Sequence, residues 1–185
     1  RLRSWLGQDS QGAPHLREDA EGRLVLGPGV VLDWDVLRSL LDSSRRCAPQ
    51  QEVELLTEAL RVVRGPMVSD AAEGRYTWLA RVRAARQFDA LVVDAAHRLV
   101  ELIGDTDPDG AATAIATGLQ VVELDQGLWR DRLRLASRRG RGELEQEIRI
   151  LLDAAGADDL DQIDPATAAL VEDLSPGLSV GRRPA

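Results

Sequence analysis

The sequence contains no lysine, one cysteine and few aromatic residues, and each shortage narrows what the chain can be. All 23 basic residues are arginine, a bias typical of GC-rich coding. Cys47 has no second cysteine to pair with, so an intramolecular disulfide is excluded and a reducing compartment is expected. Because aromatic residues make up 3% of the chain and hydrophobic residues 44%, we expect a core of leucine, valine, alanine and isoleucine.

Long apolar runs are also missing. No stretch reaches the roughly 20 apolar residues that a membrane-spanning helix needs. The first residues lack the charged-then-apolar layout of a signal peptide. A cytoplasmic location is therefore predicted, for the protein itself or for the cytoplasmic part of a larger membrane-associated protein. The net charge of −8 argues against a protein that coats nucleic acid along its whole length.

Residues suited to catalysis or metal binding are sparse. The two histidines, His15 and His97, have no cysteine or carboxylate at the sequence spacing of metal ligands. Cys47 has no histidine partner nearby, and the acidic run 158–164 lacks the central glycine and closing glutamate of a calcium loop. We therefore expect no catalytic residue, no metal, no cofactor and no small-molecule ligand.

The first 32 residues differ in pattern from the rest. Two short apolar stretches, residues 13–16 and 22–26, flank the polar run 17–21, and this alternation predicts a small β-hairpin. Before the hairpin, Leu2, Trp5 and Leu6 have helical spacing and Gly7 follows them. The chain is therefore expected to begin on the last turns of a helix that belongs to something longer.

From Asp33 onward the apolar residues recur with the period of amphipathic helices. Asp33 is predicted to cap the first of them, and Pro49 to lie in the first turn of the second. Further helices are predicted from about Tyr76 to Gly104, over residues 111–122, 128–139 and 144–155, and after Asp164-Pro165.

The pairing of these helices favours a repeat. Helix–turn–helix pairs recur at residues 95–124 and 128–156, and Gly104 and Gly140 lie 36 residues apart, close to the roughly 34-residue tetratricopeptide period. An ordinary helical bundle also places helices in pairs and stays the alternative. The predicted fold class is mainly α, with tetratricopeptide-like helical hairpin repeats and a small N-terminal β-hairpin.

Two groups of arginines are candidate binding residues. Arg1 and Arg3 at the helix end, with Arg17 and Arg23 on the hairpin, would suit DNA whose major groove meets the helix and whose phosphates meet the hairpin. The alternative is that they only solvate a surface. The second group is a candidate protein-interaction site, with ion pairing inside the chain as its alternative. Its members are Arg130, Arg132, Arg134, Arg138, Arg139 and Arg141.

Several motifs resemble two bacterial domains found in tandem. Leu2-Arg3-Ser4-Trp5-Leu6-Gly7 and Gly22-Arg23-Leu24-Val25-Leu26 resemble the end of the recognition helix and a wing strand of a winged-helix DNA-binding domain. The helical part resembles the module called the bacterial transcriptional activator domain. The matching stretches are residues 31–34, 59–66, 74–78, 94–97, 128–131 and 164–167, and the resemblance covers about residues 1–175.

The resemblance implies three parts. Residues 1–32 would be the C-terminal remnant of a winged-helix domain, with the helix end and the wing hairpin. Residues 33–175 would be a tetratricopeptide-like bacterial transcriptional activator domain, and residues 176–185 a disordered tail.

Two groups of actinobacterial proteins share this arrangement, and they imply different functions. Antibiotic-regulatory activators imply a non-enzymatic transcription regulator. Such a regulator binds DNA only through the complete winged helix, so this fragment would bind weakly or not at all. Its helical module would form a homodimer or dock a protein partner such as RNA polymerase. LysM-containing multidomain proteins imply instead a protein-interaction scaffold with no direct role in transcription.

Overall fold

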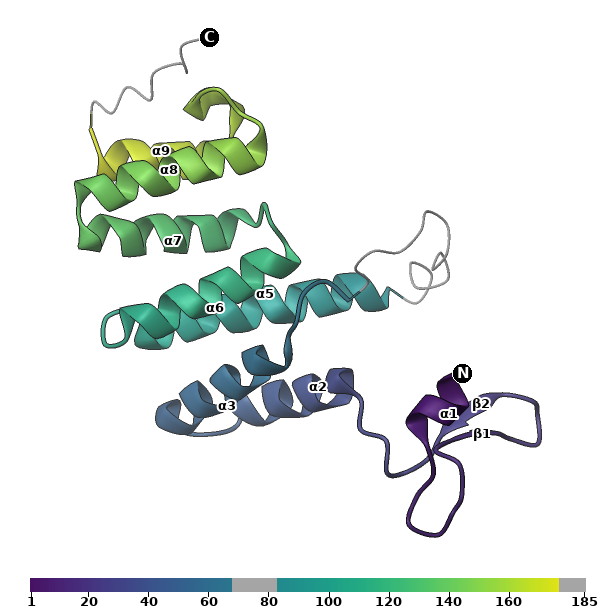
Figure 1. Cartoon of the computed structure of the whole chain (residues 1–185). Helices are drawn as coiled ribbons and strands as arrows, with labels where there is room; N and C mark the ends of the chain where they lie inside the picture. Colours follow the sequence, from purple (N-terminus) through teal and green to yellow (C-terminus); the bar gives the residue numbers. More distant parts are fainter. Residues whose placement is uncertain (68–82, 177–185) are drawn as a thin grey trace.

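The computed structural model describes residues 1–67 and 83–176. This part of the chain is mainly helical and has a two-stranded antiparallel hairpin near the N-terminus (Figure 1), which confirms the predicted mainly α class. The elements are α1 (Leu2–Leu6), β1 (Leu16–Glu18), β2 (Leu24–Leu26), α2 (Asp33–Ser44), α3 (Pro49–Val62), α5 (Ala84–Ile103), α6 (Pro108–Val121), α7 (Gln126–Arg139), α8 (Arg141–Ala155), the 3₁₀-helix η1 (Leu160–Gln162) and α9 (Pro165–Leu174).

The N-terminal unit, residues 1–32, consists of α1 and the β1–β2 hairpin. The α1 helix ends at Gly7, whose φ of 71° is one that glycine adopts at little cost. The predicted hairpin is present, but the predicted first strand is wrong in its bounds. Strand β1 starts at Leu16, which pairs with Leu26, and takes up Arg17 and Glu18 from the stretch predicted to be the turn.

The remaining helices fold back on one another in consecutive pairs. Helix α2 packs on α3, α5 on α6 and α7 on α8, and each pair then packs on the next through the contacts of α3 with α5 and of α6 with α7. Figure 1 shows these pairs stacked in chain order, and α9 closes the series by packing on α7. We refer to residues 33–176 of this arrangement as the helical stack.

One continuous apolar core runs through the helical stack from α2 to α9. As the composition predicts, it is almost entirely aliphatic, with Leu128 and Leu133 of α7 at its centre and fully buried. A side chain at Gly118 of α6 would meet the side chains of Leu128 and Ala96. Glycine therefore allows α6 to approach both neighbouring helices closely.

Most helix ends follow the signals in the sequence. The side chains of Asp107, Asp125 and Asp164 accept hydrogen bonds from backbone amides in the first turns of α6, α7 and α9. Pro49 opens α3 as predicted. The prediction that Asp33 caps its helix is wrong, because Leu32 holds the capping position and Asp33 is the first helical residue.

The long predicted helix that ends at Gly104 begins later than expected. Arg83 has a φ of 54°, a left-handed conformation that a helix cannot continue through, so α5 starts at Ala84. The part of this prediction over residues 76–82 lies outside the described residues, as does the predicted disorder of residues 177–185.

Candidate functional site

Two aspartates shape the loops of the N-terminal unit. The Asp9 carboxylate accepts hydrogen bonds from the amides of Gln11 and Ala13, both at 2.9 Å. The Asp19 carboxylate accepts from the amides of Glu21 at 3.0 Å and Arg23 at 2.8 Å. These are Asx-type turns, in which a short side chain replaces a backbone acceptor. The second of them sets the β1–β2 turn and explains why Arg17 and Glu18 belong to the strand.

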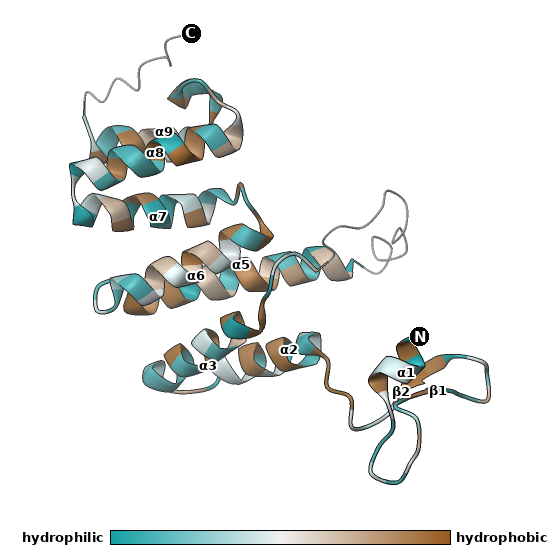
Figure 2. Cartoon of the chain, in the orientation of Figure 1, coloured by the Kyte–Doolittle hydropathy of each residue, from teal (hydrophilic) through white to brown (hydrophobic). Residues whose placement is uncertain are grey.

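The N-terminal unit leaves a large part of its apolar surface uncovered. Among the described residues, large hydrophobic side chains that are exposed concentrate in this unit, with Trp5 at 80% exposed and Leu24 at 65%. Leu16 is the buried one, because α1 packs on β1. Figure 2 shows the apolar colouring on α1 and on the neighbouring strand β2. We use the term apolar face for these exposed side chains taken together, namely Leu2, Trp5, Leu24, Leu26, Val31 and Leu32.

The four arginines proposed to meet DNA have different surroundings. Arg3 forms an ion pair with Glu18 at 3.4 Å, and both side chains are more than half exposed. Arg23 contacts two carboxylates, Asp19 at 2.8 Å and Glu21 at 2.9 Å. Arg1 and Arg17 are exposed and form no ion pair within the described part of the chain. Two of the four arginines are thus held by neighbouring acids.

The same contacts shift the titration of the turn carboxylates. The pKa of Asp19 lies below its ordinary value, chiefly because the amide of Arg23 donates a hydrogen bond to the ionised carboxylate. The pKa of Asp9 is also lowered, chiefly by the amide of Ala13. Both groups are therefore charged at neutral pH and keep the turns closed.

The arginines of the second candidate group all form ion pairs within the chain. Arg130 bonds Asp164 at 3.1 Å, which joins α7 to the start of α9. The other pairs are Arg132 with Glu147, Arg134 with Asp131, Arg138 with Asp105, Arg139 with Asp109 and Glu143, and Arg141 with Glu145. These contacts are ion pairs inside the chain, the alternative that the sequence offered to a protein-interaction site.

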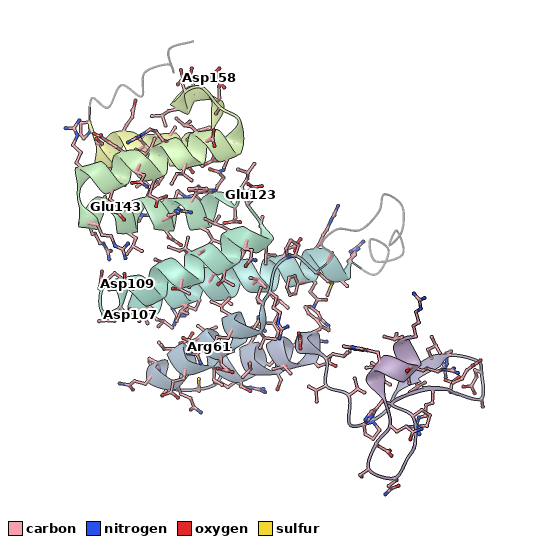
Figure 3. All side chains as sticks on the ribbon, viewed as in Figure 1. Arg61, Asp107, Asp109, Glu123, Glu143 and Asp158 are labelled. Carbon is pink, nitrogen blue, oxygen red and sulfur yellow. The ribbon has the colours of Figure 1, made fainter. Side chains whose placement is uncertain are left out.

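Arg139 shows how such a pair links separate helices. Figure 3 places Asp109 at the start of α6 and Glu143 at the start of α8 on the same side of the stack. Arg139, at the end of α7, lies 2.7 Å from Asp109 and 3.5 Å from Glu143. Its guanidinium also donates to the carbonyl of Pro108. The side chain thereby ties three helix ends together.

A network of charged residues crosses the stack from α3 to α7. No pattern in the sequence predicted these contacts. Arg98 of α5 bonds Glu52 of α3 at 2.8 Å and Glu101 of its own helix at 3.1 Å. The imidazole of His97 lies 3.6 Å from Glu101 and is bonded to the buried carboxylate of Asp131 on α7. Arg134 lies 3.3 Å from the second oxygen of Asp131.

The sequence contained only part of the information needed to predict this network. Within α5, His97, Arg98 and Glu101 stand at the three- and four-residue spacings at which helix side chains meet. The partners Glu52 and Asp131 are 46 and 34 residues away from them, so only the tertiary structure brings them close. The same holds for His97, for which the sequence showed no carboxylate at the spacing of metal ligands.

A small pocket lies between α6, α7 and α8. Its floor consists of small and aliphatic side chains, and arginine–glutamate pairs form its rim. On this rim Arg132 stacks over the Trp129 ring at 4.9 Å, and its Nε lies 2.6 Å from Glu147 Oε2. This ion pair partners the buried carboxylate oxygen of Glu147. The lining residues are Ala112, Ile115, Ala116, Arg132, Leu135, Ala136, Arg139, Glu143 and Glu147.

Metal-binding and nucleophilic groups do not converge in the described residues. Over residues 1–67 and 83–176, no group of three or more histidine, cysteine, aspartate or glutamate side chains is placed to hold a metal ion. Cys47 is half-buried after α2 and its thiol donates to the carbonyl of Ser44. This thiol therefore has a local structural contact.

Comparisons of the chain with models of protein families, with curated proteins and with solved structures gave no match. Among the described helices, none combines the length and the apolar character needed to cross a membrane. The function must therefore be argued from the chain's own geometry.

Proposed function

We propose that the chain is a non-enzymatic regulatory module, in which a tetratricopeptide-like helical domain is joined to the end of a winged-helix DNA-binding domain. It acts in the cytoplasm. The complete winged helix holds DNA, and the helical domain docks a protein partner or a second copy of the chain. The assignment of the helical part as a bacterial transcriptional activator domain rests on the motifs that resemble that family.

The apolar face of the N-terminal unit is the observation that carries this proposal. Burying a large apolar side chain contributes about 1.5–3 kcal/mol, so leaving several uncovered on one small unit is unfavourable. A segment of 32 residues is too short to enclose a core of its own. A helix and a hairpin that both leave large apolar side chains exposed have the form of one wall of a larger domain. In the proposal, the other helices of a winged helix form the opposite wall.

Three contacts at the same sequence separation, among others that range from 30 to 56 residues, support the repeat character of the helical stack. The pair His97 and Asp131 and the pair Arg130 and Asp164 both span 34 residues, and so does the bond from Arg138 to the carbonyl of Gly104. Repeats of roughly 34 residues produce such a recurrence, whereas an ordinary bundle does not require it. Stacked helical pairs of this kind present extended surfaces to protein partners.

The charge of the N-terminal unit favours a second candidate function, a protein-interaction scaffold with no direct role in transcription. Residues 1–32 carry four arginines and four carboxylates. DNA-binding surfaces are normally enriched in positive charge, because phosphate contacts supply most of the non-specific affinity. The N-terminal unit, in which positive and negative charges are equal in number, is thus less suited to bind DNA than the family resemblance implies.

Salt-dependent DNA binding tests the first proposal against the second. Anisotropy of a labelled duplex would be measured for this chain and for a version extended upstream to include the front of the winged helix. We expect only the extended protein to bind, with an affinity that falls steeply as salt rises. If neither protein binds DNA at low salt, the scaffold function replaces the regulatory one.

Trp5 offers a structural readout of the same proposal. Iodide quenching of its fluorescence, isolated by comparison with Trp5→Phe, should be strong in this chain, where the side chain is 80% exposed. The extended protein should protect Trp5, because the proposed opposite wall covers it. Equal quenching in both proteins would contradict the proposed half-core.

A further inference from the structure

We propose that Arg17 is the residue through which the hairpin contacts DNA phosphates, whereas Arg23, which the family resemblance places in the wing, closes the β1–β2 turn and makes no DNA contact. This inference rests on the proposed DNA-binding function. It assigns the phosphate contact of the wing to one side chain.

Arg23 forms two ion pairs at the turn, although its side chain is 73% exposed. Its Nε donates to Asp19 Oδ2 at 2.8 Å and its Nη2 donates to Glu21 Oε2 at 2.9 Å. Its backbone amide also donates to Asp19, so side chain and main chain hold the same carboxylate. Two acids of one turn thus occupy two of the five N–H donors of the guanidinium and offset its charge.

A phosphate can approach Arg23 only beside these two carboxylates. Exposed ion pairs are individually weak, so the bonds alone would not prevent an exchange of partners. The Asp19 carboxylate cannot move away, however, because it also accepts hydrogen bonds from the amides of Glu21 and Arg23. Its negative charge would then face the phosphate, and this repulsion opposes a contact at Arg23.

The surroundings of Arg17 differ from those of Arg23. It pairs with Val25 in the hairpin register, whereas Leu16 pairs with Leu26. Because successive side chains of a strand point to opposite faces, Arg17 lies on the face opposite Leu16 and the apolar Leu26. If the apolar face is covered within a complete domain, the Arg17 face remains outward. Arg17 is exposed and forms no ion pair within residues 1–67 and 83–176.

The test compares Arg17→Ala with Arg23→Ala in the extended protein that contains the complete winged helix. Both variants lose one positive charge, so the general electrostatic effect on DNA binding is the same. Affinity for a non-specific duplex would be measured over a range of salt concentrations. The slope of log affinity against log salt counts phosphate contacts, at about 0.9 per contact. We expect Arg17→Ala to reduce this slope by about 1 and Arg23→Ala to leave it unchanged.

A double variant, Asp19→Asn with Glu21→Gln, provides the converse test. Asparagine still accepts the backbone amides and keeps the turn, but neither new side chain holds a guanidinium by charge. Arg23 then becomes free, and the slope should rise by about 1. Circular dichroism would establish that all variants keep the parental fold.

Each outcome has a distinct meaning. If the parent protein binds and Arg23→Ala lowers the slope as much as Arg17→Ala, the assignment to Arg17 is overturned while the DNA-binding function stands. If Arg17→Ala leaves the slope unchanged, the assignment is overturned in the same way. If the extended parent does not bind DNA at all, both the function and the assignment fail.

Discussion

The helical stack and the N-terminal unit use similar residues in opposite ways. Leu133 of α7 is fully buried between helical pairs, whereas Leu24 of β2 is 65% exposed. Helices α3, α5, α6 and α7 of the stack each pack on at least two other helices, so apolar side chains on several of their faces find partners. The hairpin contacts chiefly α1 and its own strands. The difference teaches that the number of neighbouring elements, rather than residue type, decides which leucines form a core.

Charged residues differ between the two regions in the same way. In the stack, Arg98, Arg130 and Arg139 reach carboxylates on other helices or at their ends, 30 to 46 residues away. In the hairpin, Arg23 reaches acids two and four residues away. These three ion pairs of the stack therefore connect different helices, whereas those of the hairpin turn only fix the turn.

The largest expected effect comes from truncating a leucine in each region. Leu133→Ala should lower the free energy of unfolding of the stack by about 2–5 kcal/mol, because the buried isopropyl group of the leucine is removed and a cavity remains. Leu24→Ala, the matched control, should change it by no more than about 0.5 kcal/mol. Urea denaturation followed by circular dichroism measures both. Equal losses would mean that the N-terminal unit shares the core of the stack.

The next effect concerns the buried hydroxyl that joins α7 to α9. Thr167 is fully buried, and its Oγ1 donates to Gln126 Oε1 at 2.9 Å and accepts from Arg130. Thr167→Val keeps the shape but leaves Gln126 unsatisfied, which should cost about 1–3 kcal/mol. Thr167→Ser retains the hydroxyl and serves as the control. A smaller loss for valine than for serine in urea denaturation would show that packing, not hydrogen bonding, holds α9.

A pH-dependent effect is expected for the pair between α3 and α5. The hydrogen bond from Arg98 lowers the pKa of Glu52 below its ordinary value of 4.5. A carboxylate with a lowered pKa in the folded state stabilises the protein above its ordinary pKa, and this contribution is lost as the pH falls through the lowered value. Glu52→Gln should therefore lower the Tm at pH 7, by the modest amount that corresponds to about 0.2–1 kcal/mol.

The difference in Tm between Glu52→Gln and the parent should shrink as the pH falls below 4.5. Glu54→Gln on the same helix is the matched control, since Glu54 is exposed and forms no ion pair within the described residues. Its Tm should follow that of the parent at every pH. A difference that persists unchanged at low pH would argue for a packing role of Glu52.

The smallest effect on stability is expected on the apolar face. Replacing Trp5 and Leu24 together by serine should leave the Tm of the stack unchanged and reduce binding of the dye ANS, which reports exposed apolar surface. Leu124→Ser, in the stack and 45% exposed, is the control and should change ANS binding less. An unchanged ANS signal in the double variant would place the dye-binding surface elsewhere.

Local sequence signals predicted much of the fold. Aspartate followed by proline marked the start of α9, and the apolar periodicity placed the ends of α7 and α8 at the residues where the structure has them. The hairpin followed from the alternation of apolar and polar residues, although its first strand was placed too early. The Asx turn at Asp19 sets that boundary, and its hydrogen bonds depend on side-chain orientation that alternation does not report.

The candidate sites were harder to predict, because they depend on which residues become neighbours. The arginines of α7 form an evident cluster in the sequence, but their partners Asp105, Asp109 and Asp164 come from other elements. His97 lacked a visible partner until α7 brought Asp131 beside it. The difference between Arg17 and Arg23 likewise comes from the position of two acids around the turn.

The order of contacts along the stack has a consequence for communication through the molecule. Apart from the neighbouring pairs, the helices make few contacts with one another. A structural change at one end of the stack therefore reaches the other end through the helical pairs between them. A displacement of α2, which follows the hairpin in the chain, is transmitted to α9 through the contacts of α3 with α5 and of α6 with α7. The weakest of these contacts then limits how far a change at one end affects the other end. The bond between His97 of α5 and Asp131 of α7 joins the same two helical pairs as the α6–α7 junction.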